Sequence, residues 1–600
     1  MGRDNLKNRS LVFGGIVVMI SLIFIIRLAH LQLVTSEWSN YAGRLTEERE
    51  TLEPMRGQFI DRNGELVVTN IASYSLLFTP RNSKNLDTLG LANLLGLDLS
   101  ELSKRLDKAA SYSRYVPSVI LKHLSAREFA EISKPLRNYP GVKSSTQSIR
   151  SNVSGGSAGH LLGEYREVDR DDMRKDVFYK LGDYKGKSGL EAKYEKSLRG
   201  ENGARYHIVD VRNNVRRTLQ NLDTMPIPGS DVTLTLDIEL QAYAEKLLKG
   251  KRGSVVAIEP ETGEVLAIVS SPFYDANSLT GKRRGLVYDS LRKHTWKPLY
   301  NRALRGTYRP GSIFKMVQGL VALDEGVISK NTVINCDRSI IGCHGPHSAD
   351  DLTHAITHSC NPYFYEVMRR VVQRGRDSNP LVDASLGLEN WNKRIMEFGF
   401  GTNLGGHIPG TRSGSIPNSS YYDGIYGKSH WGFRTIFSIA IGEGELLTTP
   451  LQMANLAVII ANRGSFREPH AVRDIGGKGK PMGIDSLHIM SVSAKYFEPV
   501  VDAMQNVIED LHGTATRAKV DGISICGKTG TVQNGDLEDH SVFMAFAPRD
   551  NPQIAISVYV EYAGSGGSWA APIAGLLIEK YLTDTVTYSL REKRILDFQP

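Results

Sequence analysis

The chain has 600 residues, of which 41% are hydrophobic and 23% charged, with 57 glycines and 24 prolines. These proportions exclude a disordered or collagen-like chain, and a mean hydropathy of −0.26 excludes a polytopic membrane protein. Four cysteines are too few for a disulfide-built scaffold, and a net charge of +8 does not identify a partner. A chain of this length exceeds one hydrophobic core, so we expect about two to four domains.

The first element along the chain is an apolar segment, residues 11–34, which begins with an uncharged run over Leu11–Ile26. As a helix its 24 residues span about 36 Å, enough to cross a hydrocarbon core of roughly 30 Å. Three basic residues precede it and favour a cytoplasmic amino terminus: Arg3, Lys7 and Arg9. We expect residues 1–10 to be a cytoplasmic tail and the segment to be a retained, single-pass signal-anchor. The alternative is a cleaved signal peptide, but no convincing cleavage site follows.

Residues 35–231 are polar and irregular, with short strand-like stretches such as Ser73–Pro80 and Arg205–Val211. No long apolar helix stands out among them. We therefore expect an elongated, strand-rich pedestal next to the membrane.

From Val232 the hydrophobic pattern changes to that of a larger domain, residues 232–600. A strand leads into a helix that Asp237 can cap, and Gly253–Pro272 predicts a hairpin. The later expected elements are helices over Ser312–Gly326, Leu451–Gly464 and Ala571–Leu582, and strands within residues 523–533, 540–548 and 553–563. Helices between a leading hairpin and three trailing strands predict an α+β domain with one antiparallel sheet.

A Ser-x-x-Lys motif is the first of three short motifs that carry weight only together. It occurs at Ser290–Lys293, where we expect a surface turn, and at Ser312–Lys315, at the start of an apolar helix. Residues three apart on a helix share a face, and the free N–H groups at a helix start favour a developing oxyanion. Burial lowers a lysine pKa, so a neutral Lys315 can accept the serine proton. A capping serine followed by a surface lysine is the simpler interpretation of this motif alone.

Two further motifs follow in the order that serine acyl transfer requires. Ser359-Cys360-Asn361 supplies a hydroxyl that can pass a proton and an amide that can bind a peptide carbonyl. Lys528-Thr529-Gly530, followed by Thr531, lies in an expected strand beside which an extended substrate can bind, its carboxylate held by the lysine and threonine. A helix cap and a basic turn would explain these two motifs structurally, but the ordered set of three is a strong joint signal.

With these motifs the sequence resembles the penicillin-binding proteins, specifically the monofunctional class B transpeptidases, over nearly its whole length. Further matching segments are Arg56–Gly64, Gly186–Gly203, Pro272–Asn277, Asn301–Arg302 and Ile441–Gln452. Within that class it looks most like the elongation-specific peptidoglycan D,D-transpeptidases. One departure is Glu443, where the family pattern predicts glutamine.

The resemblance implies an α+β fold with a single transmembrane helix, the strand-rich pedestal and a penicillin-binding/β-lactamase-like transpeptidase domain. In that domain an antiparallel sheet carries helices on both sides. The resemblance implies no cofactor for catalysis.

The resemblance also implies a mechanism. Ser312 attacks the carbonyl between the two terminal D-alanines of a stem pentapeptide, Lys315 takes its proton, and Ser359 relays a proton to the departing amine. The amine of a neighbouring stem then resolves the acyl-enzyme into a cross-link, and β-lactam antibiotics acylate the same serine. The implied site residues are catalytic Ser312, Lys315, Ser359 and Asn361, and substrate-binding Lys528, Thr529, Gly530 and Thr531, with the backbone N–H groups of Ser312 and Thr531 as oxyanion hole.

Three of the four cysteines lie close together, with histidines between them. In an oxidising periplasm a Cys336–Cys343 disulfide would close a short loop. A second interpretation is a tetrahedral structural zinc site formed by Cys336, Cys343, His347 and Cys360, and free thiols are a third. Some members of the resembled family carry zinc in this loop, with the middle cysteine of the second motif as a ligand. Zinc there would brace the second motif. The fourth cysteine, Cys526, is expected to be a small buried residue.

Other functions compatible with the motifs are a membrane-anchored D,D-carboxypeptidase or β-lactamase, a β-lactam sensor, an inactive scaffold and a septal class B transpeptidase. A carboxypeptidase needs neither pedestal nor anchor, and a sensor needs a larger signalling part than the ten residues before the anchor.

The resemblance implies a RodA-like SEDS glycosyltransferase as partner, because no polymerase domain fits within the chain. It also implies a scaffold protein such as MreC. It further implies a bacterial inner-membrane protein with a periplasmic catalytic domain, and we expect no nucleic-acid partner.

Overall fold

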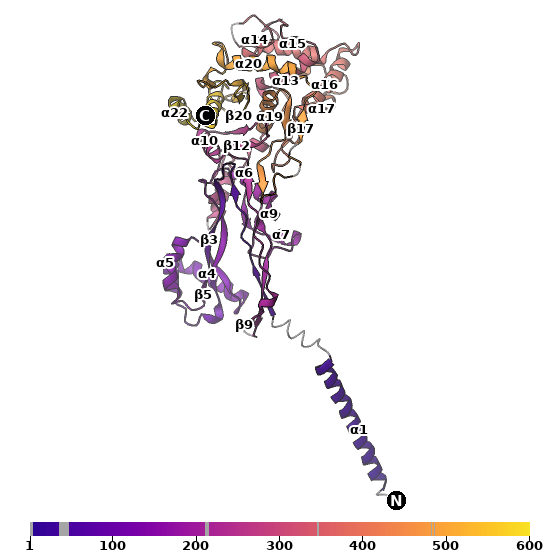
Figure 1. Cartoon of the computed structure of the whole chain (residues 1–600), viewed down its shortest axis with the longest axis vertical. Helices are drawn as coiled ribbons and strands as arrows, with labels where there is room; N and C mark the ends of the chain where they lie inside the picture. The colour runs from indigo at the N-terminus through magenta and orange to yellow at the C-terminus, as the bar shows by residue number, and fades with distance from the viewer. Residues whose placement is uncertain are drawn as a thin grey trace.

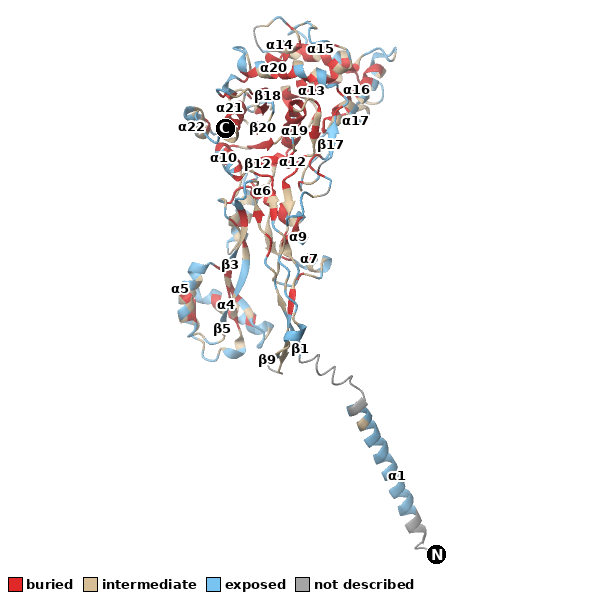
Figure 2. Ribbon diagram, viewed as in Figure 1, coloured by how far each residue is buried: buried red, intermediate tan, exposed pale blue. Residues whose placement is uncertain are grey.

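The computed structural model describes residues 4–34, 47–210, 215–281, 283–344, 347–481, 483–484 and 486–600. Arg3, Val211 and residues 35–46, at which the pedestal is expected to begin, lie outside these ranges. Helix α1 (Asp4–Ala29) continues as η1 (His30–Val34). Its stretch Arg9–Gln32 is long and apolar enough to cross a membrane, none of its residues is buried, and Figure 2 colours nearly all of this stretch as exposed. The apolar segment therefore forms the single long helix that its composition predicts.

The pedestal is elongated and divides into two prongs (Figure 1). One prong is a long antiparallel ladder, in which β3 pairs with β5 along the full length of β5 and with β4 on its other edge. The other prong is a three-stranded sheet in the order β1-β8-β9. The bounds of these strands are β1 (Glu47–Leu52), β3 (Leu66–Phe78), β4 (Ser118–Leu124), β5 (Val142–Asn152), β8 (Gly203–Val209) and β9 (Val215–Thr218).

Helices α3 (Thr88–Leu95), α4 (Leu99–Tyr112) and α5 (Ala126–Leu136) pack on the first prong, where the sequence analysis expected little but strands. They bury a small separate core, which includes Leu102 of α4 and Leu76 of β3. The apolar residues of α4 recur at helical spacing, a signal that its many charged residues obscure. The pedestal is therefore strand-rich but carries a helical lobe.

A buried network of charges connects four residues within the pedestal. Arg56 contacts Glu191 at 2.5 Å and Glu195 at 2.6 Å, and Arg150 contacts Glu191 at 2.7 Å. These residues belong to, or lie beside, the two family-like segments of the pedestal. All four side chains are more than nine-tenths buried, so each charge depends on its partners.

The expected domain boundary at residue 231 falls beside a strand that the two parts share. Strand β10 (Val232–Leu234) pairs in parallel with β2 (Phe59–Ile60) of the pedestal and antiparallel with β16 (Val472–Ile475) of the catalytic domain. The two parts are thus joined through one sheet.

The catalytic domain is built around a five-stranded antiparallel sheet in the order β12-β11-β20-β19-β18. Its strands are β11 (Gly253–Ile258), β12 (Val265–Ser271), β18 (Cys526–Val532), β19 (His540–Ala547) and β20 (Ile554–Val560). Helices α10 (Ile238–Leu248) and α21 (Ala570–Thr583) pack against this sheet, and the fully buried α19 (Pro450–Ala461) packs against it as well, on β11, β19 and β20. The expected hairpin, the three trailing strands and the helix-covered sheet are confirmed.

Details of the catalytic domain both support and correct the sequence analysis. The Asp237 carboxylate caps α10 by accepting from Leu240 N–H. Ser290–Lys293 forms the exposed end of helix α11 (Arg284–Lys293) rather than a turn, because its neighbours continue a helical pattern. A further helix, α22 (Ser589–Asp597), follows the expected closing helix and packs on α10 and α21.

Candidate functional site

Ser312 lies in η5 (Gly311–Phe314), a short turn that leads into helix α13 (Lys315–Asp324) beside the edge strand β18. The backbone before it is tightly constrained. Gly311 has a φ of +59°, and its N–H donates to the carbonyl of Gly442 at 2.9 Å. A Cβ on Gly442 would lie 2.0 Å from Gly311 O. Because Gly442 has no side chain, the loop that contains it can pack directly behind Ser312.

Lys315 is fully buried and joins the first motif to the second. Its Nζ donates to Ser359 O at 2.7 Å, to Ser359 Oγ at 3.1 Å and to Asn361 Oδ1 at 2.7 Å. Burial lowers the pKa of Lys315 to about 7, against the opposite effect of Cys343 and Cys360. A substantial fraction of this lysine is therefore neutral at neutral pH and able to accept a proton.

Asn361 uses both ends of its amide within the protein. Its Oδ1 accepts from Lys315, and its Nδ2 donates to the carbonyl of Gly342 at 2.7 Å. The second motif predicts that this amide binds a substrate carbonyl. In this structure the loop carbonyl of Gly342 occupies that donor, so a substrate must replace it.

The third motif lies on β18, whose far edge is not paired with another strand of the five-stranded sheet. Lys528 is fully buried, and its Nζ donates to Thr529 O at 3.1 Å. Burial, together with the charge of Lys315, lowers the pKa of Lys528 well below its ordinary value. The hydroxyls of Thr529 and Thr514 lie 2.7 Å apart, which fixes the threonine beside the open edge.

One cavity of about 550 Å³ brings the three motifs together. Residues of each motif line it, together with neighbours that the sequence analysis did not select for this site. The motif residues on its wall are Ser312, Ser359, Asn361, Thr529 and Thr531, and the others include Glu443, His512, Thr514 and Asp539. His512, Thr514 and Asp539 lie in irregular loops without a motif of their own, so only the fold could identify them. Glu443 belongs to a family-like segment, but only the fold places it in this cavity.

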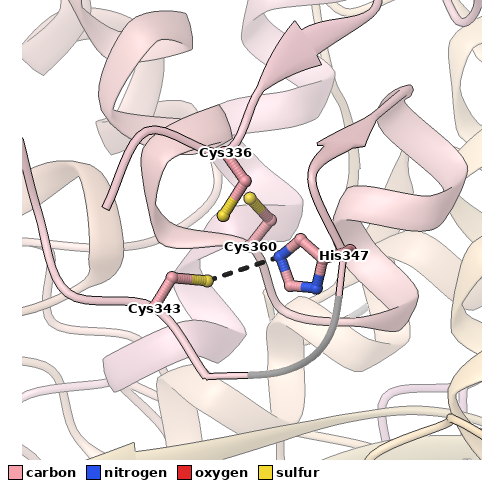
Figure 3. Close-up of side chains that lie close together, drawn as sticks. All are labelled: Cys336, Cys343, His347 and Cys360. Atoms are coloured by element: carbon pink, nitrogen blue, oxygen red, sulfur yellow. Dashed lines mark hydrogen bonds between the residues drawn. The ribbon is translucent and has the colours of Figure 1, made fainter. Parts of the chain in front are cut away.

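The cysteine cluster lies beside the second motif, as Figure 3 shows. One ligand atom from each of Cys336, Cys343, His347 and Cys360 lies within 4.8 Å of all the others, and all four cysteines of the chain are free. Cys343 Sγ is 3.4 Å from His347 Nε2. The structure thus contains the four-residue set of the zinc interpretation and not the Cys336–Cys343 disulfide, while Cys526 is buried elsewhere as expected.

The electrostatics of this cluster favour a thiolate. Hydrogen bonds from the Cys360 thiol and from the Asn361 N–H lower the pKa of Cys343 to about 4 against the effect of burial. The ring of His347 stacks on His358, and its Nε2 is 3.6 Å from the buried Asp350. Asp350, which was not predicted from the sequence, thus faces the same ring nitrogen as Cys343, at a distance too long for a hydrogen bond.

Comparison with known proteins gives the same family for both halves of the chain. The family model described as the penicillin binding protein transpeptidase domain matches residues 253–579, and the penicillin-binding protein dimerisation domain matches residues 51–234. Peptidoglycan D,D-transpeptidase MrdA of Acinetobacter baumannii is 30% identical over 607 residues, covering 95% of this chain and 86% of that protein. MrdA of Haemophilus influenzae is 30% identical over 623 residues, covering 97% and 92%. In a solved complex of a penicillin-binding protein (PBP2) with MreC from Helicobacter pylori, the similar chain has a TM-score of 0.73 at 25% identity, with 89% of this chain and 100% of that chain covered.

Proposed function

The chain belongs to the family of penicillin-binding protein transpeptidases, and on that premise we propose that it cross-links peptidoglycan during cell elongation through an acyl-enzyme on Ser312. The elongation role is supported by relatives named MrdA and by a PBP2 structure of the same architecture. The observation that carries the proposal is the hydrogen bonding of Lys315, a buried amine that begins the helix directly after the turn of Ser312 and contacts both Ser359 and Asn361.

In the acylation step, the neutral amine of Lys315 takes the hydroxyl proton of Ser312, and the serine oxygen bonds to the carbonyl carbon between the two terminal D-alanines. The backbone N–H groups of Ser312 and Thr531 face the oxyanion that forms, which is usually the largest electrostatic contribution to such catalysis. As the tetrahedral intermediate collapses, Ser359 passes a proton to the departing amine and D-alanine leaves.

The substrate is held as an extra strand on the open edge of β18. Its terminal carboxylate binds at Lys528 and Thr529, and its backbone pairs past Gly530 toward Thr531. Asn361 supports the peptide after its amide exchanges Gly342 for the substrate. The amine of a second stem then attacks the ester carbonyl, a C–N bond replaces the bond to Ser312, and the serine recovers a proton.

Labelling with a fluorescent penicillin tests this assignment. Ser312→Ala should abolish covalent labelling, whereas the matched Ser290→Ala change, in the exposed motif at the end of α11, should leave it intact. Persistent labelling of the first variant would refute the nucleophile. Products formed from a peptidoglycan donor separate the activities, because a transpeptidase yields cross-linked dimers whereas a carboxypeptidase releases D-alanine alone.

We propose that Cys336, Cys343, His347 and Cys360 hold a structural zinc ion. Three sulfurs and one imidazole nitrogen are a donor set typical of such sites, and the lowered pKa of Cys343 supplies a thiolate. Bound zinc would add cross-links between the loop and the second motif. Ser312, Lys315 and Ser359 would still carry out every proton transfer, so the zinc would have no catalytic role.

We further propose that the chain is anchored in the bacterial inner membrane by α1 with its catalytic domain in the periplasm, and that it works with a RodA-like glycosyltransferase and an MreC-type scaffold. The apolar helix supports the anchor, and the complex of PBP2 with MreC supports a scaffold partner. Co-purification from membranes tests whether the chain binds the RodA-like polymerase. Recovery of the septal polymerase instead would assign the chain to division.

A further inference from the structure

Glu443 is a carboxylate in the catalytic cavity that the mechanism above does not use. It follows Gly442, whose carbonyl accepts from the N–H of Gly311 directly before the nucleophile. Its Oε1 accepts from the backbone N–H of Gln533 at 3.3 Å, just beyond the end of β18. The carboxylate therefore connects the segment behind Ser312 with the end of the strand that binds substrate.

The charges around this carboxylate leave it poorly compensated. Its side chain is only 12% exposed, and Arg309 Nη1 is 3.8 Å from Oε2, too far for a hydrogen bond. The guanidinium is half exposed and donates its Nε–H to Gly444 O at 3.0 Å. Asp539 lines the same cavity and adds a second negative charge. Burial raises the pKa of Glu443 to about 7, although the Gln533 N–H and Arg309 act in the opposite direction, and Asp539 adds a smaller upward contribution. A cation bound beside the carboxylate would offset the cost of burying its charge.

The direction of the donor peptide decides which of its residues meets Glu443. Its carboxylate lies at Lys528 and Thr529, near the start of β18, and the carbonyl that reacts lies at the N–H of Thr531. The peptide thus runs antiparallel to the strand and advances about 3.3 Å per residue. The residue that precedes the two D-alanines then lies alongside Gln533, next to Glu443.

We propose that Glu443 determines specificity for the third residue of the donor stem, and that this residue carries a side-chain ammonium group. The proposal rests on the proposed function, because it uses the direction of a peptide that acylates Ser312. Lysine and diaminopimelate both present such an ammonium at the end of a flexible side chain. An ammonium group at this position can pair with Glu443 at closer range than the half-exposed Arg309, whose Nη1 is 3.8 Å from the carboxylate.

Rates of acylation with donors of different charge test this inference on the full chain. The donors are stem peptides ending in D-alanyl-D-alanine, with lysine, diaminopimelate or Nε-acetyllysine as third residue. The wild-type protein should prefer at least one charged donor over the neutral one by about tenfold or more. Glu443→Gln, which keeps the size and the acceptor for Gln533, should abolish that preference. Because the neutral donor is the reference within each variant, a general loss of activity cancels.

Glu538→Gln is the matched control, since it removes an exposed carboxylate of the neighbouring turn that does not line the cavity. It should retain the wild-type preference. A Glu443→Gln variant that still prefers the charged donors would overturn the inference while leaving the transpeptidase assignment intact. Absence of any acylation of wild-type Ser312 by all three donors would overturn the proposed function, and the inference with it.

Discussion

The side-chain amine of Lys315 and the side-chain carbonyl oxygen of Asn361 lie 2.7 Å apart, so the first and second motifs share a hydrogen bond. A neutral amine has two N–H groups. The two neighbours that can only accept, Ser359 O and Asn361 Oδ1, can take both. The amine lone pair then remains free for a hydroxyl, which is the state in which the lysine can receive the proton of Ser312.

The first prediction concerns pH. Because burial lowers the pKa of Lys315 to about 7, the amine is protonated below that pH and cannot accept a proton. The rate constant for acylation by penicillin should rise about tenfold per pH unit below about pH 7 and level off above it. Stopped-flow acylation between about pH 5.5 and about pH 8.5 measures this. A flat profile would contradict it, and Lys315→Arg, permanently charged, should react at least about 100-fold more slowly.

The second prediction concerns Asn361. Asn361→Ala removes one acceptor from Lys315 and leaves the carbonyl of Gly342 without this donor, so the amine is less precisely held. We expect acylation by penicillin to slow by about 10- to 100-fold. Asn331→Ala is a matched control in an exposed Ser-x-Asn sequence outside the cavity, and it should react at the wild-type rate. Equal rates for the two variants would show that Asn361 does not position the lysine.

The third prediction concerns the metal. The purified wild-type ectodomain should contain about one equivalent of zinc, and Cys360→Ser should contain much less, because a thiolate ligand is lost. Cys526→Ser, at the buried cysteine outside the cluster, should keep its zinc. Elemental analysis measures the content, and the zinc-free variant should melt at a lower temperature. Wild-type protein with no zinc after growth in zinc-containing medium would reject the site.

The fourth prediction concerns the buried charge network of the pedestal. Glu191→Gln removes the carboxylate that contacts Arg56 and Arg150, and leaves two buried guanidinium groups short of a counter-charge. Breaking a buried pair should lower the free energy of unfolding by about 3 kcal/mol. Denaturant unfolding followed by circular dichroism measures it. Glu131→Gln, in the exposed pair with Arg127, should change stability by at most about 0.5 kcal/mol, and equal losses would mean that the network is not specifically stabilising.

Some features of the fold followed from local patterns and others did not. The apolar amino-terminal helix, the hairpin of β11 and β12, and the trailing strands β18 to β20 were predictable, because the spacing of apolar residues indicates which face of an element is buried. The helical lobe of the pedestal was missed because α3 is only eight residues long and because α4 and α5 are rich in charged residues. The shared strand β10 was also missed, since pairing between residues 59 and 232 leaves no trace in either segment alone.

The sequence by itself determined the chemistry of this protein, because Ser312, Lys315, Ser359, Asn361 and Lys528 stand in three ordered motifs of limited chemical use. Only the tertiary structure decided how those groups act together. It buried Lys315 enough to lower its pKa and brought the cysteines to one point beside Cys360. It also placed Glu443 in the same cavity. Burial, charge compensation and distance depend on segments far apart along the chain, and these are the quantities that local sequence patterns do not contain.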